Sequence, residues 1–130
     1  MASIFARIVK GDLPCHKILE DERYFSFLAI HAIKPGHTLA IPKKEIDDIF
    51  DVEDELLAGL MLFSKKVAGA VRKAFPCKKV ALMVYGLEVP HAHVHLVPAH
   101  GVPGELNFSN ARPASDEELS AAAEKIRAYL

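Results

Sequence analysis

The chain is poor in cysteine, with only two among its 130 residues. Cys15 and Cys77 lie far apart, and their spacing matches neither a metal-binding pair nor a redox pair. Cysteines used this sparingly are typical of proteins from reducing compartments. We therefore expect two reduced thiols in a cytoplasmic protein rather than a disulfide.

Long apolar runs and an excess of charge of one sign are also missing. No stretch approaches the roughly 20 apolar residues of a membrane span, and residues 1–14 are too polar for a signal peptide, so a membrane is not an expected partner. Lys and Arg number 16 against 17 Asp and Glu, which gives a net charge of -1. Without a basic stripe, a nucleic acid polymer is not expected as a partner either, whereas a small anionic ligand remains compatible with the composition.

The length suits one domain, which we expect to span residues 1–130 without internal repeats or low-complexity segments. Ser3 is a candidate N-cap for a short helix that closes at Gly11. Extended segments are then predicted at residues 16–20, 24–30 and 37–42. Since charged or Pro-Gly turns separate them, we expect these segments to form an antiparallel meander.

Two further helices are predicted. Over residues 52–75 apolar side chains recur at spacings of three and four, with Asp51 as the candidate N-cap and Pro76 ending the run. Ser115 and Glu118 have the spacing of a capping box, which begins a C-terminal helix that ends near Leu130.

Between these helices lie two more strand-like segments, 79–86 and 91–98, joined by a short hairpin-like link through Gly86. The predicted fold class is therefore α+β. It consists of an antiparallel five-stranded sheet with one long central helix and a C-terminal helix, and with the helices packed on one face.

Histidines alternate with apolar residues in the second of these strands, where His91, His93 and His95 are separated by Ala92 and Val94. Because side chains of a strand alternate between its faces, the histidines are predicted to share one face, and the apolar set to pack beneath the long helix. On an extended strand the first and third histidines are roughly 13 Å apart.

The histidine row has three interpretations. It could be the polar face of a half-buried strand, although three histidines in a row are an unusual choice for that purpose. It could bind a metal ion, but one ion cannot reach residues about 13 Å apart, so His16, His31, His37 or His100 would have to supply ligands. It could be catalytic, because histidine titrates near neutrality and can attack phosphorus. The chemistry favours the third interpretation.

The segment from His91 to Val97 resembles the His-φ-His-φ-His-φ-φ signature of the histidine triad (HIT) family of nucleotide hydrolases and transferases, where φ is an apolar residue. Two further segments are similar to that family in the same order, SIFARIVKGDLPCHKILED near the N-terminus and PGHTLAIPKKE at residues 35–45. The resemblance implies a HIT-like fold, a homodimer, a small-molecule nucleotide substrate, and neither a cofactor nor a metal ion.

By this resemblance, His93 attacks the α-phosphorus, His95 contacts the phosphate or the leaving group, and His91 holds the arrangement. Nδ1–H of His93 then needs a fixed acceptor, which we expect to be a backbone carbonyl. His37 matches a supporting histidine near the site. The positions that match the family's base-binding residues are Ile4, Phe5, Ile8, Phe27 and Ile30.

The sequence also departs from the family pattern. Many members have a zinc site that opens with Cys-x-x-Cys, and the matching positions here are Ser3 and Ala6. Ala29 stands in the nucleotide-binding position where members have a ribose-binding acid. An Asn- and Gly-rich loop before the histidines is absent, and Glu88 occupies a position near the phosphate or leaving group. Among residues further along the chain, Asn107 or Asn110 could replace the lost amide.

We therefore expect a hydrolase that cleaves a nucleoside phosphoramidate or a dinucleoside polyphosphate through a nucleotidyl-histidine intermediate. Two alternatives stay open: a nucleotide-binding regulatory module with little turnover, and a metal-dependent hydrolase that uses the histidine row as ligands. For the homodimer, Leu57, Met61 and Ser64 form a second apolar face on the long helix, as interfaces often do.

Overall fold

The computed structural model describes residues 2–130. Its α-helices are α1 (Ile4–Lys10), α2 (Asp54–Ala74) and α3 (Asp116–Arg127). Short 3₁₀ turns are η1 (Ile49–Asp51) and η2 (Phe108–Asn110). The strands are β1 (Lys17–Glu20), β2 (Tyr24–Leu28), β3 (His31–Ala32), β4 (Thr38–Pro42), β5 (Lys79–Met83), β6 (Val94–Ala99) and β7 (Arg112–Pro113).

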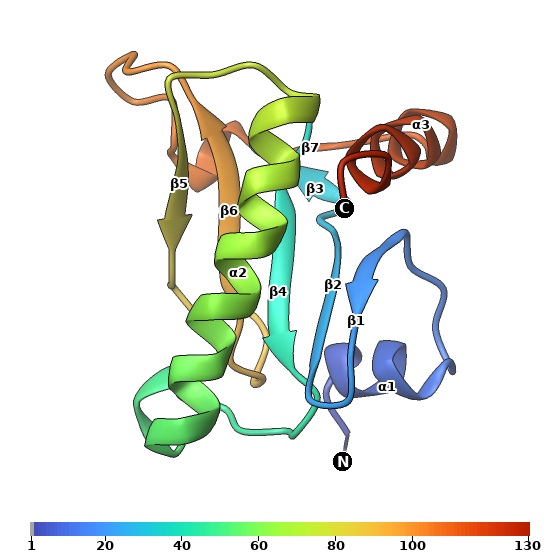
Figure 1. Cartoon of the computed structure of the whole chain (residues 1–130), viewed down its shortest axis with the longest axis vertical. Coiled ribbons are helices and arrows are strands. Elements are labelled where there is room, and N and C mark those ends of the chain that lie inside the picture. Colours follow the sequence, from blue (N-terminus) through green and yellow to red (C-terminus); the bar gives the residue numbers. More distant parts are fainter. Residues whose placement is uncertain (1) are drawn as a thin grey trace.

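The main sheet has the strand order β1-β2-β4-β6-β5, with antiparallel pairing throughout. This confirms the predicted five-stranded antiparallel sheet, and β1, β2 and β4 form the expected meander. A second, two-stranded sheet pairs β3 with β7, which brings residues 31–32 beside residues 112–113 (Figure 1). Among the described residues, no helix is both long enough and apolar enough to cross a membrane.

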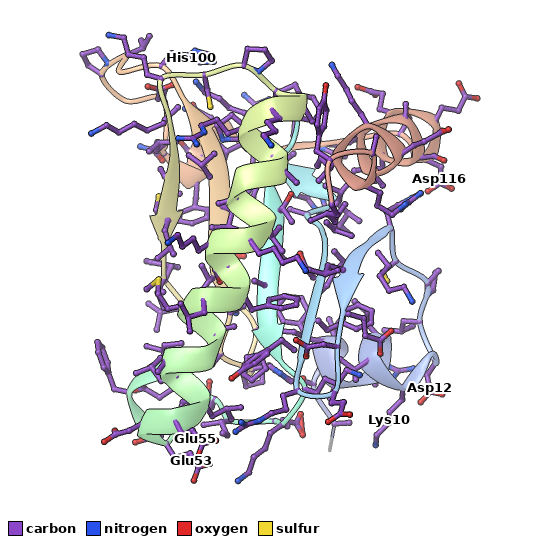
Figure 2. The ribbon with its side chains drawn as sticks, viewed as in Figure 1. Lys10, Asp12, Glu53, Glu55, His100 and Asp116 are labelled. Atoms are coloured by element: carbon purple, nitrogen blue, oxygen red, sulfur yellow. The ribbon has the colours of Figure 1, made fainter. Side chains whose placement is uncertain are left out.

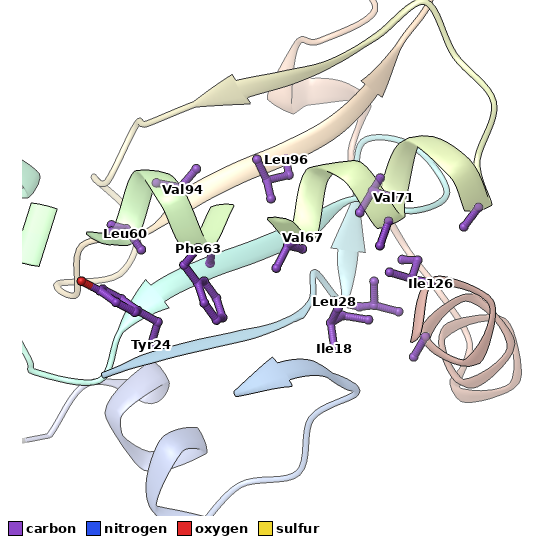
Figure 3. Packing of buried hydrophobic residues seen from close by; sticks show 14 of the residues in the cluster. Ile18, Tyr24, Leu28, Leu60, Phe63, Val67, Val71, Val94, Leu96 and Ile126 are labelled. Carbon is purple, nitrogen blue, oxygen red and sulfur yellow. The ribbon is translucent and has the colours of Figure 1, made fainter. Parts of the chain in front are cut away.

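Helix α2 covers one face of the sheet (Figure 1). Figure 3 shows Val67 and Val71 of α2 beside Leu96 of β6, with Ile126 of α3 near them, and all are almost completely buried. The predicted apolar set of β6, Val94 among them, belongs to this cluster. The packing of the strand beneath the long helix is thus confirmed.

Helix α1 packs on the opposite face, so the expectation that the helices share one face is wrong. Phe5 of α1 contacts Phe27 of β2 edge to face, and both belong to a second buried cluster with Phe25 and Leu39. The physical reason is that β2 is buried along both faces, so its alternate residues need cover on each side. The side of the sheet away from α2 is therefore partly covered as well.

The predicted caps of the two shorter helices are confirmed. Ser3 Oγ accepts from the Ala6 N–H, and Gly11 ends α1 in the left-handed conformation. At α3, Ser115 and Glu118 form the predicted capping box, although the helix ends slightly earlier than expected.

Two details of the prediction are wrong. Asp51 does not cap α2, because it belongs to η1, which Asp48 begins by accepting from the Phe50 N–H at 2.8 Å. Helix α2 starts after Glu53 without a side-chain cap. The link between β5 and β6 is also longer than a hairpin turn, since it spans residues 84–93.

Several charged side chains lie at the periphery (Figure 2). In Figure 2, Glu53 and Glu55 mark the start of α2, and Lys10 and Asp12 the end of α1. His100 lies at the far end of β6, at the top of the view.

Candidate active site

A cleft of about 560 Å³ lies on the face of the sheet that α1 partly covers. All of the residues predicted for the site line this cleft, except His91. They are Ile4, Phe5, Ile8, Phe27, Ala29, Ile30, His37, Glu88, His93 and His95. The fold thus brings together residues from α1, β2, β4, β6 and the link before β6.

His91 lies beneath the cleft and is completely buried. Its Nε2 atom is 2.8 Å from the Pro42 carbonyl oxygen, and its Nδ1 atom is 3.0 Å from Ser3 Oγ. Because a carbonyl oxygen can only accept, Nε2 carries the proton. In the neutral ring, Nδ1 then accepts from the Ser3 hydroxyl. His91 is therefore held from two sides and exposes no nitrogen to a ligand.

His93 is fixed through the backbone of His91. Its Nδ1 atom lies 2.7 Å from the His91 carbonyl oxygen, so Nδ1 carries the proton. This is the backbone carbonyl that the sequence could not identify. The Phe5 ring contacts the imidazole edge to face, with ring centroids 5.0 Å apart. The remaining nitrogen, Nε2, has an unshared electron pair in the neutral ring.

His95 is fixed by His37. The Ile33 N–H donates to Nδ1 of His37 at 3.0 Å, which leaves the proton of that ring on Nε2. Nε2–H of His37 in turn donates to Nδ1 of His95, also at 3.0 Å. The proton of neutral His95 must then be on Nε2. This chain of three groups makes His95 a hydrogen-bond donor toward the cleft.

The turn that holds His37 depends on Gly36, whose φ is +88°. A Cβ atom there would lie 2.7 Å from the ring of Phe75, so both the backbone and the packing require glycine.

Burial lowers the pKa values of His37, His93 and His95 and so keeps these three rings neutral. Desolvation lowers the pKa of His37 to about 4. Desolvation, together with His93 and His37, lowers the pKa of His95 to about 3. Burial also lowers the pKa of His93 below its usual value, while its hydrogen bond to the His91 carbonyl and the nearby charge of Glu88 act in the opposite direction. At neutral pH the row therefore offers an electron pair on His93 and an N–H on His95.

The predicted strand geometry of the row is wrong in one respect. Strand β6 begins at Val94, so His91 and His93 precede it. The backbone turns there, and the rings are not spread along a straight strand. The ring centroids of His93 and His95 are 4.9 Å apart, close enough for both to contact one phosphate group.

The apolar part of the cleft contains the positions expected to bind a base. Phe5 and Phe27 are buried and contact each other edge to face, with centroids 5.3 Å apart. Ile4 and Ile30, in contrast, are 55% and 60% exposed. Two exposed aliphatic side chains beside buried rings form a surface that a flat apolar ligand could cover.

Ala29 follows β2 and donates its N–H to the His37 carbonyl at 3.0 Å. The suggestion that Asn107 or Asn110 contributes an amide is wrong, because neither lines the cleft. Asn107 caps η2 by accepting from Ser109 N–H, and Asn110 donates to the Gly104 carbonyl.

The sequence did not predict Phe108, which the same loop places in the cleft. Its ring lies 4.9 Å from that of His95 and 5.4 Å from that of Tyr85. The carboxylate of Glu105 orders the loop, since it accepts from the backbone N–H groups of residues 100–102 and pairs with Lys34. The only signal in the sequence is one aromatic residue in a polar loop.

The residues that the structure describes contain no group of three His, Cys, Asp or Glu side chains arranged to hold a metal ion. Two of the histidines proposed as extra ligands lie elsewhere. His16 pairs with Asp116 at 3.3 Å, and His100 is separated from His93 by the length of β6, about 20 Å. The geometry therefore does not favour the metal-dependent interpretation.

Comparison with known proteins decides the family. A model of the HIT domain matches residues 10–102. The chain belongs to the histidine triad (HIT) family. This HIT protein is 32% identical to the adenosine 5'-monophosphoramidase of Schizosaccharomyces pombe, over 100% of its own length and 99% of that relative.

Solved structures agree with the HIT-like fold. A HIT-like protein from Bartonella henselae, described as involved in cell-cycle regulation, superposes with a TM-score of 0.88 at 32% identity, covering 98% of this chain and 96% of the other. A zinc-bound histidine triad family protein from Mycobacterium smegmatis gives a TM-score of 0.85 at 28% identity, covering 99% and 93%. The predicted fold is thus confirmed.

Proposed function

We propose that this HIT protein hydrolyses a nucleoside phosphoramidate or a dinucleoside polyphosphate through a nucleotidyl-histidine intermediate. The observation that carries the proposal is the hydrogen bond from Nδ1–H of His93 to the His91 carbonyl. This bond fixes the tautomer and the ring, so the electron pair of Nε2 is available to attack phosphorus. The name of the S. pombe relative supports the same reaction class.

In the first step, Nε2 of His93 forms a bond to the α-phosphorus while the bond from phosphorus to the leaving atom breaks. The electron pair of the broken bond departs on that atom. A phosphoramidate nitrogen that is already protonated leaves as a neutral amine, and a polyphosphate oxygen leaves as an anion. Attack by a side chain replaces one difficult displacement with two easier ones.

In the second step, water attacks the phosphorus and the bond to Nε2 breaks, with its electron pair returning to His93. The nucleoside monophosphate is released, and the proton of the water is taken up by the amine or by solvent. Nε2–H of His95 would donate to a phosphate oxygen in both steps, because the chain from His37 keeps that proton in place.

The apolar end of the cleft, with Phe5, Phe27 and Ile8, would hold the base. Rings and aliphatic side chains bind a flat heterocycle through burial and stacking, and they add little discrimination between bases. Positioning the base and sugar in this way brings the phosphate to His93, which contributes to the rate by orientation.

The test is the release of AMP from adenosine 5'-monophosphoramidate by the wild type and by His93→Ala. We expect the variant to lose about a thousandfold or more in kcat/KM while AMP affinity, measured by calorimetry, largely survives. His100→Ala, at the far end of β6, is the matched control and should keep the wild-type rate. Turnover by His93→Ala at the wild-type rate would contradict the mechanism. AMP binding by a wild type without turnover would instead support the regulatory alternative.

A further inference from the structure

A second cleft, of about 590 Å³, lies next to the first. His93 is the one lining residue that the two clefts share among the residues described. A phosphorus atom bonded to His93 would therefore lie at the junction, with the nucleoside in the first cleft. An in-line leaving group departs on the side of the phosphorus opposite the attacking nitrogen, and the second cleft, which adjoins this junction, offers space for it.

This second cleft is acidic and apolar at once. Asp47 and Asp48 line it, and neither carboxylate lies within ion-pair distance of a basic side chain among residues 2–130. Phe50 and Leu87 also line it and are 88% and 79% exposed. Because both belong to one cleft, they form an exposed apolar patch of the kind that commonly marks a site for a ligand or a partner.

A further carboxylate, that of Glu88, lines the first cleft, and its charge acts on the His93 ring. In the described part of the chain, no Lys or Arg lines either cleft. A polyphosphate leaving group would thus meet carboxylates and no fixed cation. A positively charged leaving group would meet the complementary charge.

From these observations we infer that the second cleft is the leaving-group site, and that it takes an amine with an apolar body and a positive charge of its own. The inference rests on the proposed function and narrows it to phosphoramidates of cationic amines. The carboxylate of Glu88, whose charge acts at His93, also favours the protonated form of the leaving nitrogen, so that the bond to phosphorus breaks with its electron pair on a neutral amine.

Tyr85 extends this site toward the first cleft. It lines the second cleft, is 54% exposed, and packs against Phe108, which contacts His95. The two rings could cover a flat group in the leaving amine, and Tyr85 adds a face for cation-π contact.

The test compares three AMP phosphoramidates that share one aromatic body. The first leaving amine is benzylamine, which has no charged group apart from the reacting nitrogen. The second is para-(aminomethyl)benzylamine, which carries an additional ammonium group. The third is para-(aminomethyl)benzoate, which carries a carboxylate. We expect kcat/KM at low salt to fall in the order ammonium, neutral, carboxylate, with about tenfold between the ends, since exposed charges each change affinity a few-fold. High salt should reduce the differences in kcat/KM among the three substrates, because the Debye length falls to about 3 Å at 1 M.

The double variant Asp47→Asn/Asp48→Asn removes both charges, and Asn at position 48 can still accept the Phe50 N–H that begins η1. In this variant the ratio between the ammonium and carboxylate substrates should collapse toward the value at high salt. Asp51→Asn/Glu53→Gln is the matched control, because it removes the same charge from exposed residues that line neither cleft. It should keep the wild-type ratio.

The outcomes separate the inference from the proposed function. Hydrolysis of all three substrates at equal rates, or fastest with the carboxylate, would overturn the inference and leave the proposed function standing. Hydrolysis of none would overturn both. If the double variant changed sedimentation but not the ranking of substrates, the cleft would be an interface between copies of the chain, and the inference would be wrong.

Discussion

The hydroxyl of Ser3 lies 3.0 Å from Nδ1 of His91, and it joins the start of α1 to the histidine row across 88 positions of sequence. Ser3 also caps α1 by accepting from Ala6 N–H at 3.0 Å. One hydroxyl therefore fixes α1, and with it Phe5, relative to the ring of His91, whose carbonyl oxygen holds His93. By the family resemblance, Ser3 and Ala6 match the positions of cysteines in members with a zinc site.

This contact leads to a prediction of metal independence. A side-chain hydrogen bond holds α1 and His91 together, and no metal ion is required for that purpose. Protein treated with EDTA and then dialysed should keep its full rate with adenosine 5'-monophosphoramidate. Loss of activity on chelation, with recovery when Zn²⁺ is added, would favour the metal-dependent interpretation instead.

A second prediction concerns stability in mild acid. In the unfolded chain His37 and His95 titrate near pH 6.5, whereas in the folded chain their pKa values fall to about 4 and about 3. The unfolded state therefore binds more protons as the pH falls below 6.5, and the free energy of unfolding decreases, by roughly 2 kcal/mol for each buried imidazole at pH 5.

Urea unfolding at pH 7 and pH 5 measures this decrease. Folded Glu105 does not titrate between pH 7 and pH 5, because Lys34 and backbone N–H groups lower its pKa to about 2. His37→Gln should reduce the difference in the free energy of unfolding between pH 7 and pH 5. Equal stability of the wild type at both would show that these rings are not held neutral.

A third prediction is a homodimer, which the family resemblance implies. Strand β5 is an edge of the sheet, and its neighbourhood exposes Met61 by 53% and Leu82 by 39% around a cleft of about 390 Å³. Leu57 lines this cleft, but Ser64 is completely buried, so its place in the proposed interface was wrong.

Sedimentation of the wild type should show a dimer at micromolar concentration, and Met61→Arg should shift it to monomer by placing a charge in the interface. Lys65→Arg, which keeps the charge of a neighbouring exposed residue, is the control. A wild type that sediments only as a 14.3 kDa species would contradict the prediction.

A fourth prediction follows from Ala29, which lines the cleft at the position where the family resemblance implies a ribose-binding acid. Its side chain offers the sugar neither a donor nor an acceptor, so we expect weak discrimination between AMP and dAMP phosphoramidates. Ala29→Asp should tighten AMP binding by about tenfold, because hydrogen bonds to a charged group are worth about 1.5–3 kcal/mol. Ala29→Leu is the uncharged control.

The measurement is kcat/KM for matched ribo and deoxyribo substrates. A wild-type preference above about a hundredfold for the ribo form, near 2.7 kcal/mol, would mean that another group recognises the ribose.

Much of the fold could be predicted because its signals are local. Caps such as Ser3 and Ser115 satisfy backbone groups within three residues, and the apolar spacing of α2 and the alternation around Val94 record which side of each element is buried. The start of α2 was misplaced because Asp48 accepts from the Phe50 N–H and begins η1. Asp51 belongs to that turn and so does not cap α2.

The site was only partly predictable because its decisive contacts are long-range. The tautomers of the histidines depend on the Pro42 carbonyl and the Ile33 N–H, which no motif marks. Phe108 reaches His95 because β7 pairs with β3, and that pairing involves two residues on each strand, too few to produce a periodic pattern.

The central claim is that His93 forms a covalent bond to phosphorus, and the configuration at phosphorus tests it most directly. The substrate is an adenosine phosphoramidothioate of known configuration. The wild type hydrolyses it in water enriched in the heavy oxygen isotope, and the product is a chiral adenosine phosphorothioate. Each in-line displacement inverts the phosphorus, so attack by His93 followed by attack of water predicts net retention. Net inversion would show a single displacement by water and would contradict the account.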